Sequence, residues 1–482
     1  MDTAILSLAA YQERRLGERF RARAHAALDE WLDRLEAQMT ESGSAGPTLM
    51  DLTAAVLQER AGLTGGLVEA FIERRYGSYL VQEEAVCPGC RRPLKGRPAR
   101  ARTVETLVGR VALVRPYFYC GACAQGFYPL DEALGLAARS KQWDVQQAGC
   151  KLALEMPHER AATLLQELTD AAMSDCVIHE VVQQMGQLEV LQVCPSAADL
   201  QERIAQAAVG RKWKPIVVLA IDAAAVPSRP ETARGTRPGR KHRRARRRRW
   251  QGEYHEAKGF RFYLVDDDRI VQLFSWHQVG DEEAFGAALR QVKDAGLIPE
   301  DQVRLCAIAD GAPWIWKWVT ALFPSARQIL DYYHCSSYLH AVAEAQYGDD
   351  PARASHWLEA TLARLFCGES PGVVWGLQRL QSASEEAAAA IDGALTYLAK
   401  RLHQVDYAAH RKGGYPIGSG AIESAHRFIA HVRLKRSGAW WYSENSNAIL
   451  ALRCALYNGT LEQVFQHHRD RQLTATRTVT IS

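Results

Sequence analysis

The sequence IVVLAID at residues 216–222 is a six-residue apolar run followed at once by an acid. A second, largely apolar run, from Val303 to Ala309 in VRLCAIAD, ends in the same way at Asp310. Runs of this length that are rich in Val, Ile and Leu are typical of strands buried on both faces of a sheet. We therefore expect two buried strands, with Asp222 and Asp310 at their C-terminal ends.

A third acid, Glu423, lies just past a glycine turn in PIGSGAIESAHRF, residues 416–428, near the start of a predicted helix. Three carboxylates that converge offer the hard oxygen ligands that magnesium or manganese prefers, and they suit two ions per site. Such a pair activates water or a hydroxyl against a phosphodiester. Each acid also has a simpler interpretation. An Asp after a strand often caps a turn or a helix, and Glu423 could pair with Arg427 one turn along its helix.

Four of the eleven cysteines form two pairs, CPGC at 87–90 and CGAC at 120–123. Two such knuckles supply four thiolates, which is the ligand set of a tetrahedral, structural zinc site with no open position. Segments 102–108 and 110–119 predict a hairpin with Gly109 at its turn. The module is therefore expected to be a zinc ribbon. Its expected ligands are Cys87, Cys90, Cys120 and Cys123.

Helical periodicity dominates the rest of the N-terminal half. Apolar residues recur at helical spacing between Ala4 and Met39, and again at about 49–76. A helix from Pro157 to about Leu168, a short turn and a second helix with Ser174 as its N-cap resemble a helix-turn-helix. Two packed helices with no DNA contact explain the same pattern, so both interpretations stay open.

The order of the expected elements indicates a multidomain α+β protein. From residue 209, a strand, a hairpin, a helix, two strands and then helices follow one another, which is the order of an RNase H-like α/β core. The acidic turn 266–269 of the hairpin is interpreted as solvated rather than functional. The expected regions are 1–84, helical; 85–132, zinc ribbon; 133–208, helical and helix-turn-helix-like; 209–334, first part of the core; 335–412, all-α insertion; and 413–482, last part of the core.

Charge is concentrated rather than spread. The 482-residue chain is 47% hydrophobic and 24% charged, as in ordinary globular proteins, with a formal net charge of +4. The run RKHRRARRRR at 240–249 has eight Lys or Arg and no acid. Such a block is either solvated or bound to a polyanion. The residues expected to contact DNA are Arg240, Lys241, Arg243, Arg244, Arg246, Arg247, Arg248, Arg249, Arg427 and Lys435.

A second basic island surrounds the cysteine pairs and makes that module an expected DNA contact. Its members are Arg91, Arg92, Lys95, Arg97, Arg100, Arg102, Arg110 and Arg115. No stretch of the chain reaches the roughly 18 apolar residues of a membrane span. The N-terminus lacks a basic n-region, so no signal peptide and a cytoplasmic protein are expected.

Four motifs in order resemble one family. They are AIDAAAVPS around Asp222, AIADGAPWIW around Asp310, DYYH at 331–334 and PIGSGAIES around Glu423. Together they are similar to those of the bacterial insertion-sequence transposases of the DDE class, and most similar to the ISKra-four group, relatives of the Mutator-type transposases. The resemblance covers about residues 85–460. The length of the arginine run departs from the family pattern.

The resemblance implies a function. Asp222, Asp310 and Glu423 would be the metal-binding triad, and His334, with Asp331, would match a D-x-x-H signature that helps to orient the site. The protein would cut DNA at its element's terminal repeats and transfer the strand to target DNA, as a homodimer or larger assembly near the bacterial nucleoid. The alternatives are an inactive or domesticated DNA-binding regulator and a structure-specific nuclease that never joins strands.

Overall fold

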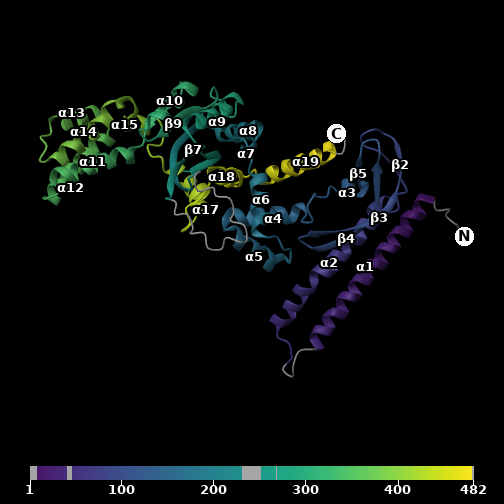
Figure 1. The fold of residues 1–482 in the computed structure, drawn as a ribbon. Coiled ribbons are helices and arrows are strands. Elements are labelled where there is room, and N and C mark those ends of the chain that lie inside the picture. The colour runs from purple at the N-terminus through teal and green to yellow at the C-terminus, as the bar shows by residue number, and fades with distance from the viewer. Residues whose placement is uncertain (1–7, 41–45, 231–250, 267–268, 480–482) are drawn as a thin grey trace. The chain divides into compact units, whose positions relative to one another are not determined.

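The computed structural model describes residues 8–40, 46–230, 251–266 and 269–479 (Figure 1). Its residues group into two compact units, Met1–Val182 with Phe465–Ser482, and Gln183–Val464. Both units mix helices and strands, which confirms the expected α+β class. None of the described helices is long and apolar enough to cross a membrane.

The first unit begins with two long antiparallel helices, α1 (Leu8–Thr40) and α2 (Leu49–Leu80), which lie side by side in Figure 1. Thr48 and Asp51 form a reciprocal capping box that fixes the start of α2. Only Gly65 and Ala70 of α2 are fully buried. Gly65 is required because a Cβ there would lie 2.4 Å from the Arg110 carbonyl oxygen, so α2 approaches the neighbouring hairpin backbone to backbone.

Five short or medium strands follow. β1 (Glu84–Val86) pairs with β2 (Pro93–Lys95), while β3 (Arg97–Thr106), β4 (Gly109–Cys120) and β5 (Gln125–Phe127) form an antiparallel sheet in that order. The expected hairpin is therefore present, with Gly109 at a φ of +127°. Its core contains Val104, Val111 and Leu113, which pack against Val68 and Ile72 of α2.

The remaining helices of this unit follow the sheet. They are α3 (Pro129–Ala133), α4 (Trp143–Glu155), α5 (His158–Thr169) and the first part of α6 (Asp175–Met185), with most of α19 (Leu461–Val479). Asp170 ends α5 in a left-handed conformation, with φ of 60°. The Ser174 hydroxyl accepts a hydrogen bond from the Val177 N–H, 3.3 Å away, as expected for an N-cap. The two predicted helices are present.

The second unit opens with two short helices, α7 (Val190–Val193) and α8 (Ala197–Ala208), and is built on a five-stranded sheet. The strands are β6 (Ile216–Ser228), β7 (Glu253–Asp266), β8 (Arg269–Val279), β9 (Arg304–Ala309) and β10 (Arg327–Leu330). Their order is β10-β9-β6-β7-β8. β7 is antiparallel to β6 and β8, whereas β9 and β10 run parallel to β6.

One expected boundary was wrong. The apolar run predicted that the first strand ends at Asp222, but β6 continues to Ser228. The reason is tertiary. Pairing with β9 stops at Ile221, while pairing with β7 continues to the last residue of the strand. The sequence also predicts an arginine-rich loop over residues 227–250, but its first residues, 227 and 228, belong to β6. Residues 231–250 lie outside the described part of the chain, as do 267–268 of the acidic turn.

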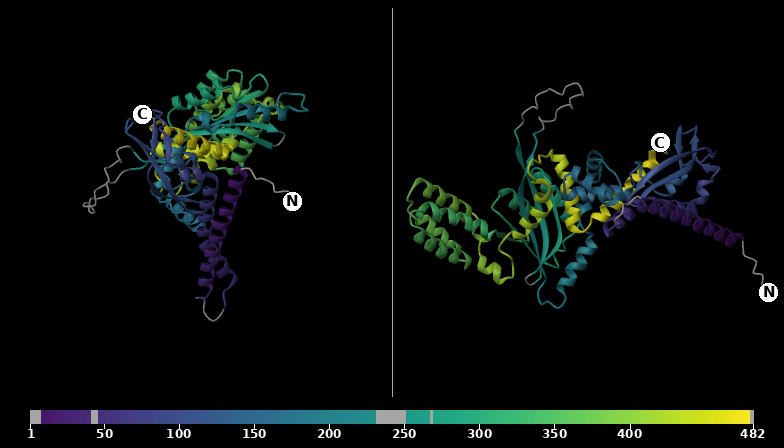
Figure 2. Two further views of the ribbon diagram at one scale, coloured as in Figure 1. Left: turned by 90° about the vertical axis from the view of Figure 1, so that its right-hand side faces the viewer. Right: turned by 90° about the horizontal axis from the view of Figure 1, so that it is seen from below.

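Helices complete the second unit. α9 (Glu282–Asp294) and α10 (Pro313–Leu322) flank β9 in sequence. The region without strand signal forms α11 (Tyr332–Tyr347), α12 (Pro351–Phe366), α13 (Ser370–Arg379), α14 (Glu385–Ala399), a 3₁₀ turn (Leu402–Gln404) and α15 (Tyr407–Lys412). The right-hand view of Figure 2 shows this helical block, in green, at one end of the unit beyond the sheet.

The last segment combines α16 (Gly420–His426), a π turn (Arg427–His431), α17 (Val432–Leu434) and α18 (Ser443–Asn458). Arg453, fully buried on α18, donates from Nε to the carbonyls of Phe428 and Ile429 in the π turn, at 2.9 and 3.0 Å. The π turn disturbs the regular hydrogen bonds of the helix, and the Arg453 side chain supplies a donor to two of its carbonyl groups. π turns of this kind are frequent at functional sites.

Helix α18 also covers the edge strand β8. Asn447 exchanges two hydrogen bonds with the backbone of Val279, and Asn458 does the same with Ser275. Eleven residues span about three helical turns, so both amides lie on one face of α18. They satisfy backbone groups that an edge strand would otherwise offer to another chain.

Candidate functional site

Asp222 lies on β6, and Asp310 directly follows the adjacent parallel strand β9. Ile221 of β6 lies opposite Ala309 of β9, and each is followed by one of the two acids. The Asp222 Oδ1 accepts a hydrogen bond from the Ala223 N–H at 2.7 Å. Asp310 accepts one from the Ala312 N–H at 2.9 Å, which is a local turn rather than a side-chain cap of α10. Both carboxylates are half-buried.

Glu423 reaches the same region from a helix. α16 lies against β6 and β7, held by the buried Arg261 of β7. The guanidinium donates to the Ala421 carbonyl at 2.5 Å and to the Ser424 hydroxyl at 2.9 Å, on either side of Glu423. Glu423 itself is exposed. No ion pair with Arg427 forms in the described structure, so the simpler interpretation of Glu423 as a helix pair has no support.

The D-x-x-H segment connects to the glycine turn before Glu423. Asp331 is buried, with 1% exposed, and its carboxylate accepts hydrogen bonds from the backbone N–H groups of His334 and Ser419. The Tyr332 N–H donates to the Ile417 carbonyl at 2.9 Å. Burial opposes ionisation, but the hydrogen bonds from His334 and Ser419 outweigh it and lower the pKa of Asp331. Asp331 therefore acts as an anchor between two loops.

His334 lies at the acidic end of the sheet with its side chain 47% exposed, and its Nδ1 lies 3.6 Å from the Asp331 Oδ1. Its hydrogen bond with Asp331 raises the pKa of His334. Burial opposes this rise, while the charges of Asp331, Asp310 and Asp222 add to it. The half-exposed imidazole beside these carboxylates is accessible to an anionic substrate.

Asp222 is held in an environment that opposes its charge. Burial raises its pKa to about 6. The Ala223 N–H and the charge of His334 act against this rise, while the negative charges of Asp310 and Glu423 add to it. Neighbouring negative charges that oppose the ionisation of Asp222 favour a cation at this site.

One buried histidine also faces Asp222 and was not singled out by the sequence. The Nε2 of His426 lies 3.5 Å from the Asp222 Oδ2, and His426 is 2% exposed. Burial lowers the pKa of His426 to about 4. Arg261 was missed in the same way. A histidine three residues after an acid, or an arginine inside an apolar hairpin, gives no signal until the fold brings its partners together.

The four cysteines are the most tightly gathered candidate. Among the described residues, they alone form a group of three or more His, Cys, Asp or Glu side chains whose ligand atoms all lie within 4.8 Å of one another. The sulfurs of Cys87 and Cys123 are 3.9 Å apart, and those of Cys90 and Cys120 are 3.5 Å apart. A tetrahedral zinc with bonds of ~2.3 Å requires sulfurs about 3.8 Å apart. The cluster could therefore hold a structural metal such as zinc, whereas the three carboxylates are less closely gathered.

The knuckles also fit a metal chemically. The residue after each second cysteine, Arg91 and Ala124, has a left-handed backbone, with φ of 61° and 53°. A hydrogen bond from the Cys90 N–H lowers the pKa of Cys87 to about 6. Hydrogen bonding with Cys90, burial and the other sulfurs raise the pKa of Cys123 to about 12. Four thiols this close do not all ionise unless a cation compensates them.

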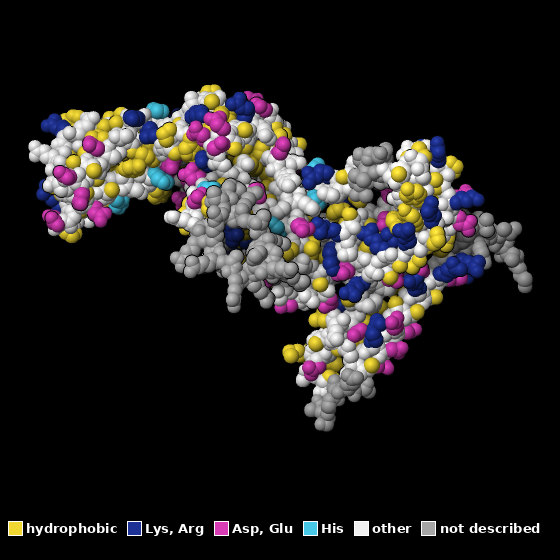
Figure 3. Space-filling view, in the orientation of Figure 1, with side chains coloured by type: hydrophobic (Ala, Val, Ile, Leu, Met, Phe, Trp, Pro, Cys, Tyr) yellow, Lys and Arg dark blue, Asp and Glu magenta, His cyan; other side chains and the backbone are white. Residues whose placement is uncertain are grey.

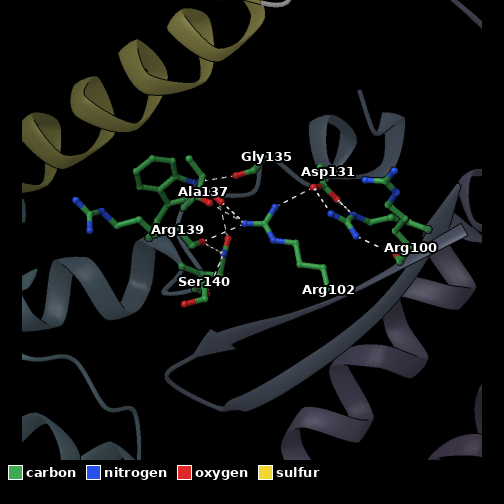
Figure 4. Close-up of polar contacts among 11 residues, drawn as sticks. Arg100, Arg102, Asp131, Gly135, Ala137, Arg139 and Ser140 are labelled. Atoms are coloured by element: carbon green, nitrogen blue, oxygen red, sulfur yellow. Dashed lines mark hydrogen bonds and ion pairs between the residues drawn. The ribbon is translucent and has the colours of Figure 1, made fainter. Parts of the chain in front are cut away.

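Part of the basic island serves the fold. Figure 4 shows Arg102 reaching Asp131 on one side and the carbonyls of Ala137 and Arg139 on the other. Arg115, 4% exposed, forms a second ion pair with Asp131. These two arginines fasten the hairpin to α3 and to the loop after it. Arg102 and Arg115 therefore have a structural role, and the contact of this module with DNA stays a prediction.

Other members of the island remain exposed. The guanidinium of Arg97 lies 4.9 Å from the ring centre of Tyr119, and that of Arg100 lies 4.2 Å from Tyr117. Figure 3 shows Lys and Arg side chains, in dark blue, gathered over these strands. In the second unit, Arg427 and Lys435 are exposed near Glu423 in sequence. The predicted contacts at 240–249 lie outside the described residues.

No protein-family model and no curated protein matches this chain.

Proposed function

We propose that this chain is a metal-dependent DNA transposase of the DDE class, which cuts DNA at the ends of its element and joins them to target DNA. The observation that carries the proposal is the placement of the three acids. Ile221 of β6 pairs with Ala309 of the parallel strand β9, and Asp222 and Asp310 directly follow these two residues. Glu423 lies on α16, the helix packed against β6. Charge coupling between Asp222 and the other two acids supports their assignment to one site.

The strand order supports an RNase H-like core. Three consecutive strands form an antiparallel meander, and two later strands run parallel to the first and lie on its other side. Along the chain, the elements follow one another as a strand, a hairpin, a helix and two further strands, which is the sequence of elements predicted for such a core. The helical block from α11 to α15 lies between the fifth strand and the helix with Glu423, where an all-α insertion was expected.

Asp222, Asp310 and Glu423 would hold magnesium or manganese, two ions per site. Bound there, the ions would supply Lewis acidity and a nucleophile of lowered pKa. The residues of the chain orient the reaction. His334 would contact a phosphate oxygen. Asp331 would hold the segment that carries His334 against the glycine turn that precedes Glu423. Arg427 and Lys435 would bind the DNA backbone in a salt-dependent way.

Recognition of the terminal repeats is assigned to the N-terminal region: the zinc ribbon, α5 and α6. The arginine run at 240–249 would add affinity that is independent of sequence. Two element ends must be joined in one event, so a homodimer or larger assembly on DNA is expected. The proposed location is the bacterial cytoplasm, at the nucleoid.

The test uses the full chain, loaded with zinc, and labelled duplexes from the DNA that flanks its own gene. We expect magnesium-dependent nicking at one flank and joining to a second duplex, both lost in Asp310→Asn while DNA binding persists. Nicking without joined product would replace the transposase with a nuclease. Binding of the flanks without any cleavage would favour the DNA-binding regulator. A joining activity retained in Asp310→Asn would overturn the proposed site.

A further inference from the structure

A row of residues crosses the sheet directly behind Asp222. Asp222 of β6 lies opposite Gly259 of β7, and Gly259 lies opposite His277 of β8. Gly259 has no side chain, and His277 occupies the space above it. A Cβ at Gly259 would lie 2.3 Å from the His277 Cδ2. Because Gly259 has no side chain, the imidazole of His277 on the edge strand β8 can extend over Gly259 toward Asp222.

A second imidazole completes the row from above. His426 of α16 lies edge-on to His277, with ring centres 4.7 Å apart, and its Nε2 lies 3.5 Å from the Asp222 Oδ2. On its far side, the His277 Nδ1 lies 4.0 Å from the Cys454 sulfur on α18. The order across the sheet is thus carboxylate, imidazole, imidazole and thiol, and both rings are almost completely buried.

The polar atoms of this row are poorly satisfied. Among the described residues, neither ring nitrogen of His426 has a hydrogen-bond partner of ordinary geometry, and the same holds for the His277 Nε2. Buried polar atoms without partners are costly and therefore rare in proteins. Three of them on two imidazoles in contact, one of which faces the Asp222 carboxylate, call for a functional explanation. In unliganded sites, hydrogen bonds to functional groups are often long and tighten when the site is filled.

We propose that His426, supported by His277, is a positioning residue that fixes the Asp222 carboxylate for cation binding. The Ala223 N–H already holds Oδ1 of this carboxylate. A hydrogen bond from His426 to Oδ2 would hold the second oxygen and set the plane of the group. Outer partners of this kind fix the orientation of metal-binding side chains. This inference rests on the proposed function, because it assigns Asp222 to a metal site.

The test measures manganese affinity by electron paramagnetic resonance on the full, zinc-loaded chain. His426→Phe keeps a ring but removes the donor, and affinity should fall about tenfold or more. His426→Gln places an amide nitrogen near the position of Nε2 and should stay within about threefold of the wild type. His431→Phe is the matched control, on the same helical segment but without contact to Asp222, and should bind normally. Gly259→Ala should reproduce the His426→Phe result by displacing His277.

The outcomes separate this inference from the proposed function. If the wild type binds manganese at a site lost in Asp222→Asn, but His426→Phe binds equally well, the positioning role is wrong and the proposed site survives. If the wild type shows no site that depends on Asp222, both fall. If His426→Phe does not fold, His426→Gln against Gly259→Ala decides. The positioning role is supported if His426→Gln binds manganese tightly while Gly259→Ala binds it weakly. Equal manganese affinities of the two variants overturn it.

Discussion

The four-cysteine cluster and the three-carboxylate site hold their ligands in opposite ways. The cysteines come from two short knuckles joined by one hairpin, and their sulfurs are already at the spacing of a tetrahedral ion. The carboxylates come from two strands and a helix that are up to 201 residues apart in sequence, and they are more loosely gathered. A closed set of thiols suits a permanent structural ion. An open set of acids leaves room for substrate oxygens.

The largest expected effect is a difference in how far each unit depends on its metal ion for folding. Removing zinc by chelation, or Cys90→Ser, should unfold the strands β1 to β5, because zinc binding provides on the order of 10 kcal/mol in small zinc domains. Removing magnesium should leave the second unit folded. Circular dichroism and limited proteolysis of both units measure this. If the zinc-free protein kept the β3–β4 hairpin folded, the claim that the zinc ion is structural would be wrong.

A second change asks what holds the cysteine module besides metal. Asp131→Ala leaves the buried Arg115 and the half-buried Arg102 without their shared carboxylate. Breaking such a buried pair costs about 3–5 kcal/mol. Urea unfolding of the zinc-loaded protein should show this loss in the first unit. Glu180→Ala, which removes an exposed ion pair with Arg139, is the control and should cost less than about 1 kcal/mol.

The open site predicts a pH dependence. Burial raises the pKa of Asp222 from its ordinary value to about 6, so the folded chain binds a proton more tightly than the unfolded chain. Stability contributed by this group is therefore lost as pH rises from about 4 through 6. At roughly 1.4 kcal/mol per tenfold change in acidity, the loss is at most about 3 kcal/mol. In zinc-loaded protein without magnesium or manganese, Asp222→Asn should match the stability of the wild-type second unit near pH 4 and exceed it at neutral pH. Equal stability at both pH values would contradict this.

The smallest expected effect concerns the basic residues near the open site. Replacing Arg427 and Lys435 with alanine should weaken duplex binding several-fold. It should also flatten the slope of log affinity against log salt concentration, by about 0.9 for each phosphate that these residues neutralise. Fluorescence anisotropy at several salt concentrations measures both. Arg290→Ala, an exposed arginine on α9, is the matched control. An unchanged slope in the double variant would remove these residues from the DNA surface.

The comparison also explains what the sequence could predict. The apolar runs identified the two central strands, because a strand buried on both faces needs such a run whatever its neighbours are. The cysteine pairs identified their cluster because the ligand spacing is local. The extension of β6 from Ala223 to Ser228 gave no such signal, since it depends on pairing with β7.

Tertiary partners lie beyond this kind of prediction. Nothing local marks Arg261 as the residue that holds α16, or Asn447 and Asn458 as the cover of an edge strand. The left-handed positions in the two knuckles carry Arg91 and Ala124 rather than glycine, so nothing in the sequence indicated this backbone conformation. The triad residues were named from order and motif. Their grouping into one metal site stays a prediction.

The most direct test of the central claim is to locate manganese by anomalous scattering in crystals of the zinc-loaded chain, with a duplex bound. We predict manganese peaks among the carboxylates of Asp222, Asp310 and Glu423, and their loss in Glu423→Gln. Density at the four cysteines alone, with none at the three acids in the presence of DNA, would contradict the account.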